Sequence, residues 1–400
     1  MPIVTLSWYW QSGDDLVLEN GNVLGGDFIA FYMGGLCFVE DSRRLYDASF
    51  QKEVRDKLFR DSGKQYEKVL PYVYPPLVAA GFALLTNFSY STAFYIYLLV
   101  SVVVGVGALL WLVIELGIRT HGWYWILALI AGFFPFSMNT LMGGQISWLG
   151  MAMVSVVIIL LRRGFDFSAG VLVSLSYYKP PLFLFLLVVL LICRGISFLK
   201  GFLVGGVVLV GTSFVFVGWE GCLGFLQAAS GYTYGQELPE GVELDRNQGA
   251  GVYGLLTVVL GKAFWAGLAL MLLFGLALIA TYQNRPKVLD SEQANLWFAW
   301  VIMISVGLSI QCIRYDLAIL LPVVLLSLPA LDRLLPRRLG LLVALGITGF
   351  YVEWMVRWSA FSGLGINLSS ILFIVCGLVW ALVNAQLRKY EIEKRRVSVE

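Results

Sequence analysis

The chain has 400 residues, of which 59% are hydrophobic and 14% are charged, and its formal net charge is +2. A soluble globular domain carries about 25% charged residues, so the composition excludes an ordinary soluble domain. The near-neutral charge and the absence of a basic patch interleaved with aromatic residues argue against a nucleic-acid partner. Apolar segments of about 20 residues recur, each long enough to cross a bilayer core. The sequence therefore predicts an all-α polytopic membrane protein embedded in a lipid bilayer.

The first part of the chain, residues 1–74, is predicted to form an outer loop with an amphipathic helix. Within residues 40–68, 15 of 29 positions are charged, and Phe50, Val54 and Leu58 recur every four residues. Apolar residues at this spacing form one face of a helix, as in helices that lie along a membrane interface. An ordinary solvated helix is the alternative interpretation.

The rest of the chain is predicted to form a transmembrane domain, residues 75–387, followed by a charged cytoplasmic tail, residues 388–400. About 10–12 membrane segments, including short or re-entrant helices, are expected from the lengths of the apolar stretches. One of the first three pieces is expected not to cross, because the charges of the flanking loops do not alternate cleanly. The predicted apolar spans are 75–87, 91–117, 123–141, 143–161, 198–217, 253–281, 293–313, 315–331, 339–356 and 364–387.

The positive-inside rule orients these segments. The long connection 218–252 carries five acidic residues against Arg246 alone, so it is predicted to lie outside. The short basic turns are predicted to lie in the cytoplasm; they contain Arg162 and Arg163, Arg194 and Lys200, Arg285 and Lys287, Arg333, Arg337 and Arg338, and the basic residues of the tail.

One segment departs from this simple pattern. Residues 168–192 are apolar except for Lys179, which is followed by Pro180 and Pro181, and both flanks of the segment are basic. The residue before a proline is disfavoured in the helical region, so two short helices joined at Lys179 are expected, with both ends in the cytoplasm. A charge at such depth is costly unless it is paired, which makes Lys179 a functional candidate. A single kinked span with a snorkelling lysine is the alternative.

Chemistry is expected on the outer face, where several polar residues interrupt the apolar pattern. Asp27, in a glycine-rich turn, is the candidate catalytic residue, with an ordinary turn residue as the alternative. Transfer of a sugar to a hydroxyl group needs a carboxylate to take the acceptor proton and cations to hold a departing phosphate. The candidate substrate-binding residues are Tyr32, Tyr74, Asn139, Gln145, Lys179, Asn247, Gln248 and Arg314. Gln145 has the alternative role of bonding a neighbouring helix.

No pattern typical of a metal or cofactor site is present. The cysteines, Cys37, Cys193, Cys222, Cys312 and Cys376, are scattered singly, and no pair has the spacing of a metal-binding motif. The single histidine, His121, is interpreted as a connector residue in a short turn. HExxH, GxSxG and P-loop motifs are absent, so zinc, serine and ATP hydrolysis have no support. No cofactor and no metal are expected.

The order of several short motifs resembles that of a known family. These motifs are Gly26-Asp27-Phe28 with Tyr32, Leu45-Tyr46-Asp47, Tyr74-Pro75-Pro76, Gly144-Gln145, Ala169-Gly170 with Lys179-Pro180, and Asn247-Gln248. Over residues 25–330 the chain is similar to the bacterial polyprenol-phosphate-mannose-dependent α-mannosyltransferases of the GT-C superfamily.

The resemblance implies a GT-C-like transmembrane helix bundle in a bacterial plasma (inner) membrane, with its active site facing the periplasm. It implies an inverting transfer of mannose or a similar hexose from a polyprenyl-phosphate-linked sugar donor to a glycolipid or glycan acceptor, with Asp27 as the general base. The family usually has a transmembrane helix before the aspartate loop, where this chain has only the short apolar run from Met1 to Trp10. We therefore expect a further apolar segment encoded upstream of Met1, with loss of the family's first span as the alternative.

Two other classes of membrane protein remain as alternatives. A transporter or flippase of lipid-linked saccharides places ionisable groups at mid-membrane, and only Lys179 fits that description. A polysaccharide polymerase or ligase would share the outer site and the lipid substrate; such enzymes more often have an Arg- and His-rich late outer loop, whereas 218–252 is acidic.

Overall fold

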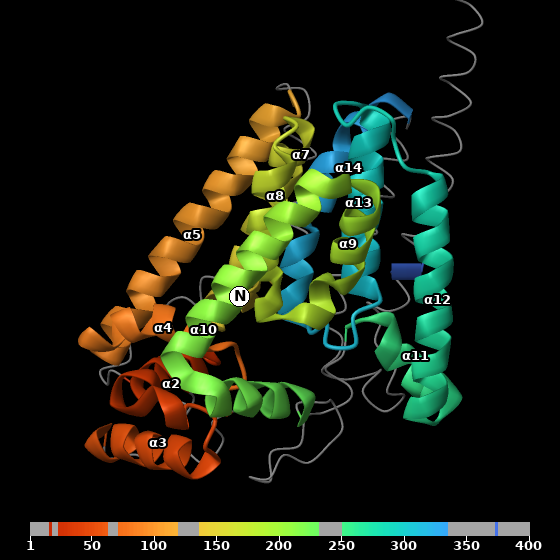
Figure 1. The fold of residues 1–400 in the computed structure, drawn as a ribbon. Coiled ribbons are helices and arrows are strands. Elements are labelled where there is room, and N and C mark those ends of the chain that lie inside the picture. The colour runs from red at the N-terminus through yellow and green to blue at the C-terminus, as the bar shows by residue number, and fades with distance from the viewer. Residues whose placement is uncertain are drawn as a thin grey trace, which may run out of the picture. The chain divides into compact units, whose positions relative to one another are not determined.

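A computed structural model describes residues 16–17, 23–62, 71–118, 136–231, 250–334 and 373–374 of the chain. The protein is about 82% helical and has no strands in the part described, which confirms the all-α prediction (Figure 1). The predicted spans 339–356 and 364–387 lie outside the described residues apart from Phe373 and Ile374, and His121, Asn247, Gln248 and the tail lie outside them entirely.

Three helices in the described part are long and apolar enough to cross a membrane: α5 (Tyr90–Glu115), α10 (Gly195–Gly231) and α12 (Ala263–Gln283). A fourth span is counted if the segment Phe136–Met142 and α7 (Ser147–Arg162) form one broken crossing. Large apolar side chains of α5 and α10 are exposed, including Ile114 at 75% and Val215 at 79%. Such surfaces are expected of helices that face lipid, which agrees with a polytopic membrane protein.

Several of the predicted spans differ from the observed helices. Residues 75–87 form only α4 (Pro76–Ala83) and a 3-10 turn, η2 (Leu84–Asn87), which together reach about 20 Å and are too short for a bilayer core of about 30 Å. The predicted span 253–281 is wrong, because it is divided into α11 (Val252–Leu260) and α12. Gly261 ends α11 in the left-handed region at φ 67°, a conformation that glycine adopts without steric cost.

The chain separates into two compact units, neither of which is continuous in sequence. The predicted boundaries at residues 74 and 388 separate the outer loop, the membrane domain and the tail. The two compact units do not test these boundaries, which stay predictions. Unit 1 consists of residues 1–104, 138–146 and 204–244, and unit 2 consists of residues 105–137, 147–203 and 245–400. Helix α5 begins in unit 1 and ends in unit 2, and α10 begins in unit 2, ends in unit 1 and is kinked at Gly218.

Unit 1 is built around α2 (Phe28–Asp41), which packs against α4 and α3 (Ala48–Ser62). A short 3-10 turn, η1 (Ser42–Arg44), joins α2 to the loop before α3. Phe50 and Val54 are buried on one face of α3, and Lys52 and Asp56 are exposed. An amphipathic helix within residues 40–68 is therefore confirmed, while its place at a membrane interface stays a prediction.

The core of unit 2 is α13 (Glu292–Gly307), which packs against α9 (Pro180–Cys193) and α14 (Leu321–Leu334). These helices lie side by side in the view of Figure 1. A 3-10 turn, η6 (Arg314–Leu320), follows α13 and contacts α7. Helix α13 ends at Gly307, earlier than the predicted span limit of 313, and its apolar residues are buried along almost its whole length.

The segment that contains Lys179 forms the predicted pair of short helices. Helix α8 (Asp166–Val173) continues into a 3-10 turn, η4 (Ser174–Tyr178), and α9 begins directly after Lys179. Lys179 has φ −147° and ψ 69°, outside the helical region, as expected for a residue that precedes proline. Arg194 at the end of α9 donates to Asp166 at the start of α8, at 2.6 and 3.0 Å. The two ends of the segment therefore meet, which confirms the helical hairpin.

Candidate functional site

Asp27 stands directly before α2, in a turn whose backbone is fixed by several hydrogen bonds. Gly25 and Gly26 both have positive φ, and the N–H of Phe28 donates to the carbonyl of Gly25 at 2.9 Å. The N–H of Asp27 donates to the carbonyl of Gly143 at 3.0 Å. Although Asp27 occupies the N-cap position, its side chain makes no capping hydrogen bond to α2. The carboxylate therefore does not cap the helix, which is the usual role of an aspartate at this position.

The side chain of Asp27 meets Gln145, a residue 118 positions later in the chain. The amide nitrogen of Gln145 donates to Oδ2 of Asp27, which is half-buried, whereas Gln145 is almost fully buried. Gln145 is held in turn by its backbone, since its carbonyl accepts from the hydroxyl of Tyr97 at 2.8 Å and its N–H donates to Thr140. An amide donor and the start of a helix both favour a negatively charged carboxylate.

Gly144 makes this approach of the two chain segments possible. It has φ 63°, and a Cβ atom at this position would lie 2.3 Å from Cβ of Phe28 and 2.6 Å from the carbonyl oxygen of Gly25. Only glycine fits both the backbone conformation and the space. The pair Gly144-Gln145 in the sequence therefore has a physical reason, because one residue allows the close contact and the next contacts Asp27.

Three other predicted substrate-binding residues are also in unit 1. Tyr32 is buried, and its hydroxyl donates to the carbonyl of Phe88 at 2.9 Å. The ring of Tyr74 lies 4.6 Å from the ring of Phe31, measured between centroids. Asn139 is exposed, and its carbonyl accepts from Gly143 within the turn that leads to Gln145. The structure therefore gives Tyr32 and Tyr74 internal contacts and leaves the side chain of Asn139 at the surface.

The Leu45-Tyr46-Asp47 motif connects the parts of the first loop. The hydroxyl of Tyr46 donates to the carbonyl of Tyr74 at 2.7 Å, so the motif is joined to Tyr74-Pro75-Pro76. Asp47 accepts from the N–H groups of Ser49 and Phe50 at 2.9 and 3.2 Å and so caps the start of α3. These hydrogen bonds, with the one from the Ser49 hydroxyl as the largest cause, lower the pKa of Asp47 to about 2.

Gln51 fixes the other side of the same loop and is not predicted from the sequence as a site residue. Its amide nitrogen donates to the carbonyls of Leu45 and Tyr72, and its amide oxygen accepts from the N–H of Tyr72 at 2.9 Å. The residue is 5% exposed. A glutamine among charged residues gives no sequence signal for such a role, because only its burial distinguishes it.

A second cluster of charged residues lies in unit 2, at the tip of the helical hairpin. Nζ of Lys179 lies 2.6 Å from Oδ2 of Asp316, a residue of η6. Asp316 is 0% exposed and Lys179 is 9% exposed. The other carboxylate oxygen of Asp316 accepts from the hydroxyl of Ser147 at 2.5 Å, and the ring of Tyr315 lies 4.9 Å from Nζ of Lys179. The buried charge of Lys179 is therefore paired, as such a position requires.

Arg314 begins the turn that carries Asp316. Its Nε atom is buried and has no hydrogen-bond partner among the described residues. A buried guanidinium donor without a partner is costly, and a bound anion would satisfy it. Arg314 is therefore a better candidate for an anion contact than Lys179 alone, whose ammonium group is already bonded to Asp316.

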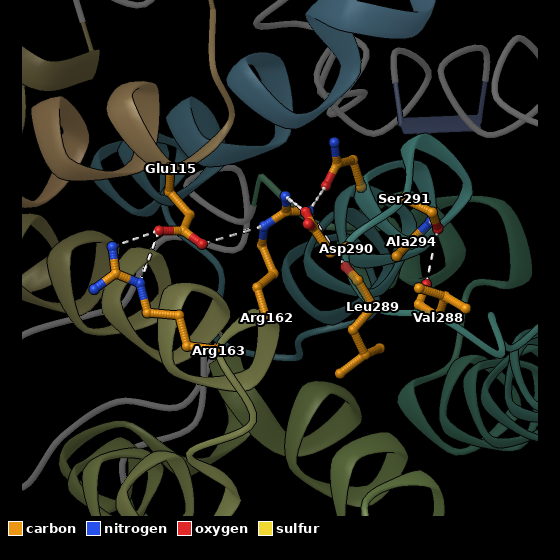
Figure 2. Close-up of polar contacts among 9 residues, drawn as sticks. Glu115, Arg162, Arg163, Val288, Leu289, Asp290, Ser291 and Ala294 are labelled. Carbon is orange, nitrogen blue, oxygen red and sulfur yellow. Dashed lines mark hydrogen bonds and ion pairs between the residues drawn. The ribbon is translucent and has the colours of Figure 1, made fainter.

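The opposite end of unit 2 is held by a different group of ion pairs, shown in Figure 2. Arg162 at the end of α7 donates to Asp290 and Asn295, which belong to the start of α13 and the loop before it. Nη2 of Arg163 lies 2.7 Å from Glu115 at the end of α5. These contacts join the end of α7 to the end of α5 and the start of α13, and the side of the membrane on which they lie stays a prediction.

The two ends of unit 2 are separated by the length of α7. This helix begins at Ser147, which contacts Asp316, and ends at Arg162. Its 16 residues extend about 24 Å, which is less than a bilayer core of about 30 Å. Unit 2 therefore carries the Lys179 and Asp316 pair at one polar end and the ion pairs of Arg162 and Arg163 at the other.

Asp316 and Ser147 are not predicted as site residues, yet Asp316 is the partner that Lys179 needs and Ser147 donates to Asp316. A signal is present in the sequence, since Asp316 is the only acidic residue between positions 293 and 331 and ionisable residues in apolar segments pair with one another. Among the residues that the structure describes, no group of three metal-binding side chains was found.

The chain was compared with known proteins. The family model described as glycosyltransferase family 87 matches residues 72–304, which is more than half of the chain. Gln145, Lys179 and the Tyr74-Pro75-Pro76 motif lie within the match, and Asp27, Arg314 and Asp316 lie outside it. No curated protein and no solved structure matches the chain. The family match together with the apolar helices of the fold shows that this chain belongs to glycosyltransferase family 87 and is a multi-pass membrane glycosyltransferase.

Proposed function

We propose that the chain transfers mannose or a similar hexose from a polyprenyl-phosphate donor to a glycolipid or glycan acceptor, with inversion at the sugar carbon and Asp27 as the general base. The observation that carries this proposal is the orientation of Asp27. Its side chain is not used to cap α2 and instead accepts a hydrogen bond from Gln145. Membership of a glycosyltransferase family favours this function over the transporter alternative.

The reaction needs a base on the acceptor side. As the acceptor oxygen bonds to the sugar carbon, its proton passes to the carboxylate of Asp27, and the bonding pair between the sugar carbon and the phosphate oxygen moves to the phosphate. A general base must be ionised beforehand and open to the acceptor. Asp27 is half-buried rather than enclosed, and the amide of Gln145 favours its charged form.

The reaction also needs cations, since negative charge develops on the leaving phosphate. In unit 2, Lys179 and Arg314 are the proposed phosphate contacts. The unsatisfied buried Nε of Arg314 supports this role most directly. Asn247 and Gln248, outside the described residues, and Gln145 are proposed to contact sugar hydroxyls.

The proposed orientation follows from the basic end of unit 2. Arg162, Arg163 and Arg194 belong to short connections, where positive charge is retained in the cytoplasm. If that end is cytoplasmic, Lys179 at the opposite end of α7 and α9 is directed toward the exterior. We propose a periplasmic site on this basis, in a bacterial inner membrane as the resemblance to the bacterial mannosyltransferases implies.

The test compares Asp27→Asn with a matched control, Asp56→Asn, which changes an exposed aspartate of α3 in the same unit. Membranes containing each variant are supplied with a radiolabelled polyprenyl-phosphate hexose, and label in new glycolipid or glycan is counted against membranes that lack the protein. A general base contributes about 10²–10⁴-fold in rate, so Asp27→Asn is expected to lose transfer by that factor while donor binding and the control stay unchanged. Near-normal transfer by Asp27→Asn would contradict the role of Asp27.

A further inference from the structure

Asp316 is fixed in a way that does not depend on Lys179 alone. One carboxylate oxygen accepts from the hydroxyl of Ser147 at 2.5 Å, and the other accepts from the backbone N–H of Ile313 at 2.8 Å. Lys179 is the third donor, at 2.6 Å. A lysine ammonium group turns readily about its stem, whereas two of the three bonds to Asp316 come from the fixed ends of α7 and η6.

The cluster therefore has a fixed negative charge beside its cations. Lys179 and Arg314 contribute two positive charges and Asp316 contributes one negative charge, so the three residues carry a net charge of +1. Among the residues that the structure describes, Asp316 is the only acidic residue that is completely buried. Burial places its charge in a medium of low effective dielectric, where one unit of charge strongly changes the affinity for an anion.

The charge of the lipid phosphate changes during the proposed reaction. A polyprenyl-phosphate sugar is a phosphodiester with a single negative charge. When the bond from the sugar carbon to the phosphate oxygen breaks, the lipid becomes a phosphate monoester, whose second ionisation has a pKa of about 6. The product thus carries close to two negative charges above neutral pH, one more than the donor.

We propose that Asp316 lowers the charge of this cluster from +2 to +1 to match the monoanionic donor, so that the dianionic product is held less tightly than two uncompensated cations would hold it, which promotes its release. The inference rests on the proposed polyprenyl-phosphate donor and extends it, because it assigns a role to a carboxylate that touches neither the sugar nor the acceptor. Asp316 acts through Lys179 and through its own charge; it is a positioning residue and not a catalytic one.

The experiment compares two probes that share one lipid chain, farnesyl phosphate and its methyl diester, bound at pH 8 to the full-length protein in detergent. The quantity measured is the ratio of the two dissociation constants, which does not depend on the fraction of protein that is correctly folded. The wild-type protein, whose cluster carries a net charge of +1, is expected to prefer the monoester to the diester by less than about tenfold. Asp316→Asn is expected to shift the ratio toward the monoester by at least about tenfold, as expected for one charge at close range.

Further variants separate charge from structure. Asp316→Glu keeps the charge and is expected to keep the wild-type ratio even if both affinities fall. The double variant Lys179→Met with Asp316→Asn removes one charge of each sign, so its ratio is expected to return toward the wild-type value. Asp290→Asn, at an exposed residue of the other end of unit 2, is the matched control and is expected to keep the wild-type ratio.

Each outcome decides between the alternatives. An unchanged ratio in Asp316→Asn, or a wild-type protein that prefers the monoester tenfold, would overturn the role of Asp316 while leaving the polyprenyl-phosphate donor in place. A wild-type protein that binds neither probe would overturn the proposed donor itself, and the role of Asp316 with it. If Asp316→Asn does not fold, the wild-type preference still tests the inference.

Discussion

Arg194 donates two hydrogen bonds to one carboxylate oxygen of Asp166, and this contact closes the hairpin formed by α8 and α9. The two residues stand at opposite ends of a 29-residue segment that reads in the sequence as one apolar stretch interrupted by Lys179. Because its ends meet, the segment returns to the side from which it starts, and Lys179 lies at its tip. The hairpin therefore adds no net crossing, and the helix before it ends on the same side from which the helix after it begins.

This closure predicts the result of a labelling experiment. In a variant without the five native cysteines, single cysteines are placed at Phe165 and Ile196, which are exposed beside the two ends of the hairpin. Both are expected to react with a membrane-impermeant maleimide from the same side. A cysteine at Val288, in the loop before α13, should react from that side as well, and one at Phe264, at the far end of α12, from the other. Labelling of positions 165 and 196 from opposite sides would mean a single crossing.

Gly144→Ala is expected to disrupt the contact between Asp27 and Gln145. The new methyl group would lie within 3 Å of Phe28 and Gly25, at a position with positive φ, and such strain costs about 1–3 kcal/mol. We expect a lower Tm of the purified protein and a loss of transfer activity. Gly107→Ala in α5 is the control, because no atom lies within 4 Å of the added methyl group; an equal effect of both changes would exclude a local cause.

Asp47 is expected to stabilise unit 1 in a pH-dependent way. Its pKa is lowered from 3.8 to about 2 by hydrogen bonds from Ser49, Phe50 and Arg44, so its contribution is complete above about pH 4 and is lost as the pH falls through about 2. Loss of an N-cap costs about 0.5–2 kcal/mol, and Asp47→Ala should lower the Tm at pH 7 accordingly. Asp47→Asn keeps a capping oxygen and should lose less at pH 7. A Tm at pH 7 that is the same in Asp47→Ala and the wild type would contradict the capping role.

Lys179→Met is expected to weaken donor use strongly, because a desolvated cation is lost from the proposed phosphate contacts. Lys179→Arg should restore activity only in part, since a planar guanidinium does not replace the compact ammonium group beside Asp316. The measurement is KM for the labelled donor, with Lys262→Met, at an exposed lysine, as the control. Full activity of Lys179→Met would show that this cation does not contact the phosphate.

Arg162→Met is expected to destabilise the protein more than Arg163→Met. The side chain of Arg162 is 5% exposed and contacts Asp290, Asn295 and the carbonyl of Leu289, whereas that of Arg163 is 45% exposed. Removal of Arg162 leaves the buried amide oxygen of Asn295 without its donor, which costs about 1–3 kcal/mol, whereas an exposed ion pair contributes about 0–1 kcal/mol. The Tm of both variants in the same detergent is the measurement, and a smaller loss for Arg162→Met would contradict the importance of burial.

The order of local signals in the sequence determined much of the fold. A composition with few charges and long apolar stretches leaves only helices as a means of satisfying the backbone in lipid, and the described part of the chain is about 82% helical with no strands. The break at Lys179 follows from Pro180, because proline restricts the residue before it. The amphipathic helix before residue 68 follows from the spacing of Phe50 and Val54. Each of these is a property of neighbouring residues.

Contacts between distant residues were decided only by the tertiary structure. A lone Lys179 in an apolar segment requires a partner, but the sequence does not say that the partner is Asp316, 137 positions later. From the sequence, the amide of Gln145 could bond either a neighbouring helix or the carboxylate of Asp27. The backbone turn at Gly144 brings it to Asp27. Burial makes such groups need a partner, and which partner they meet depends on how the helices pack.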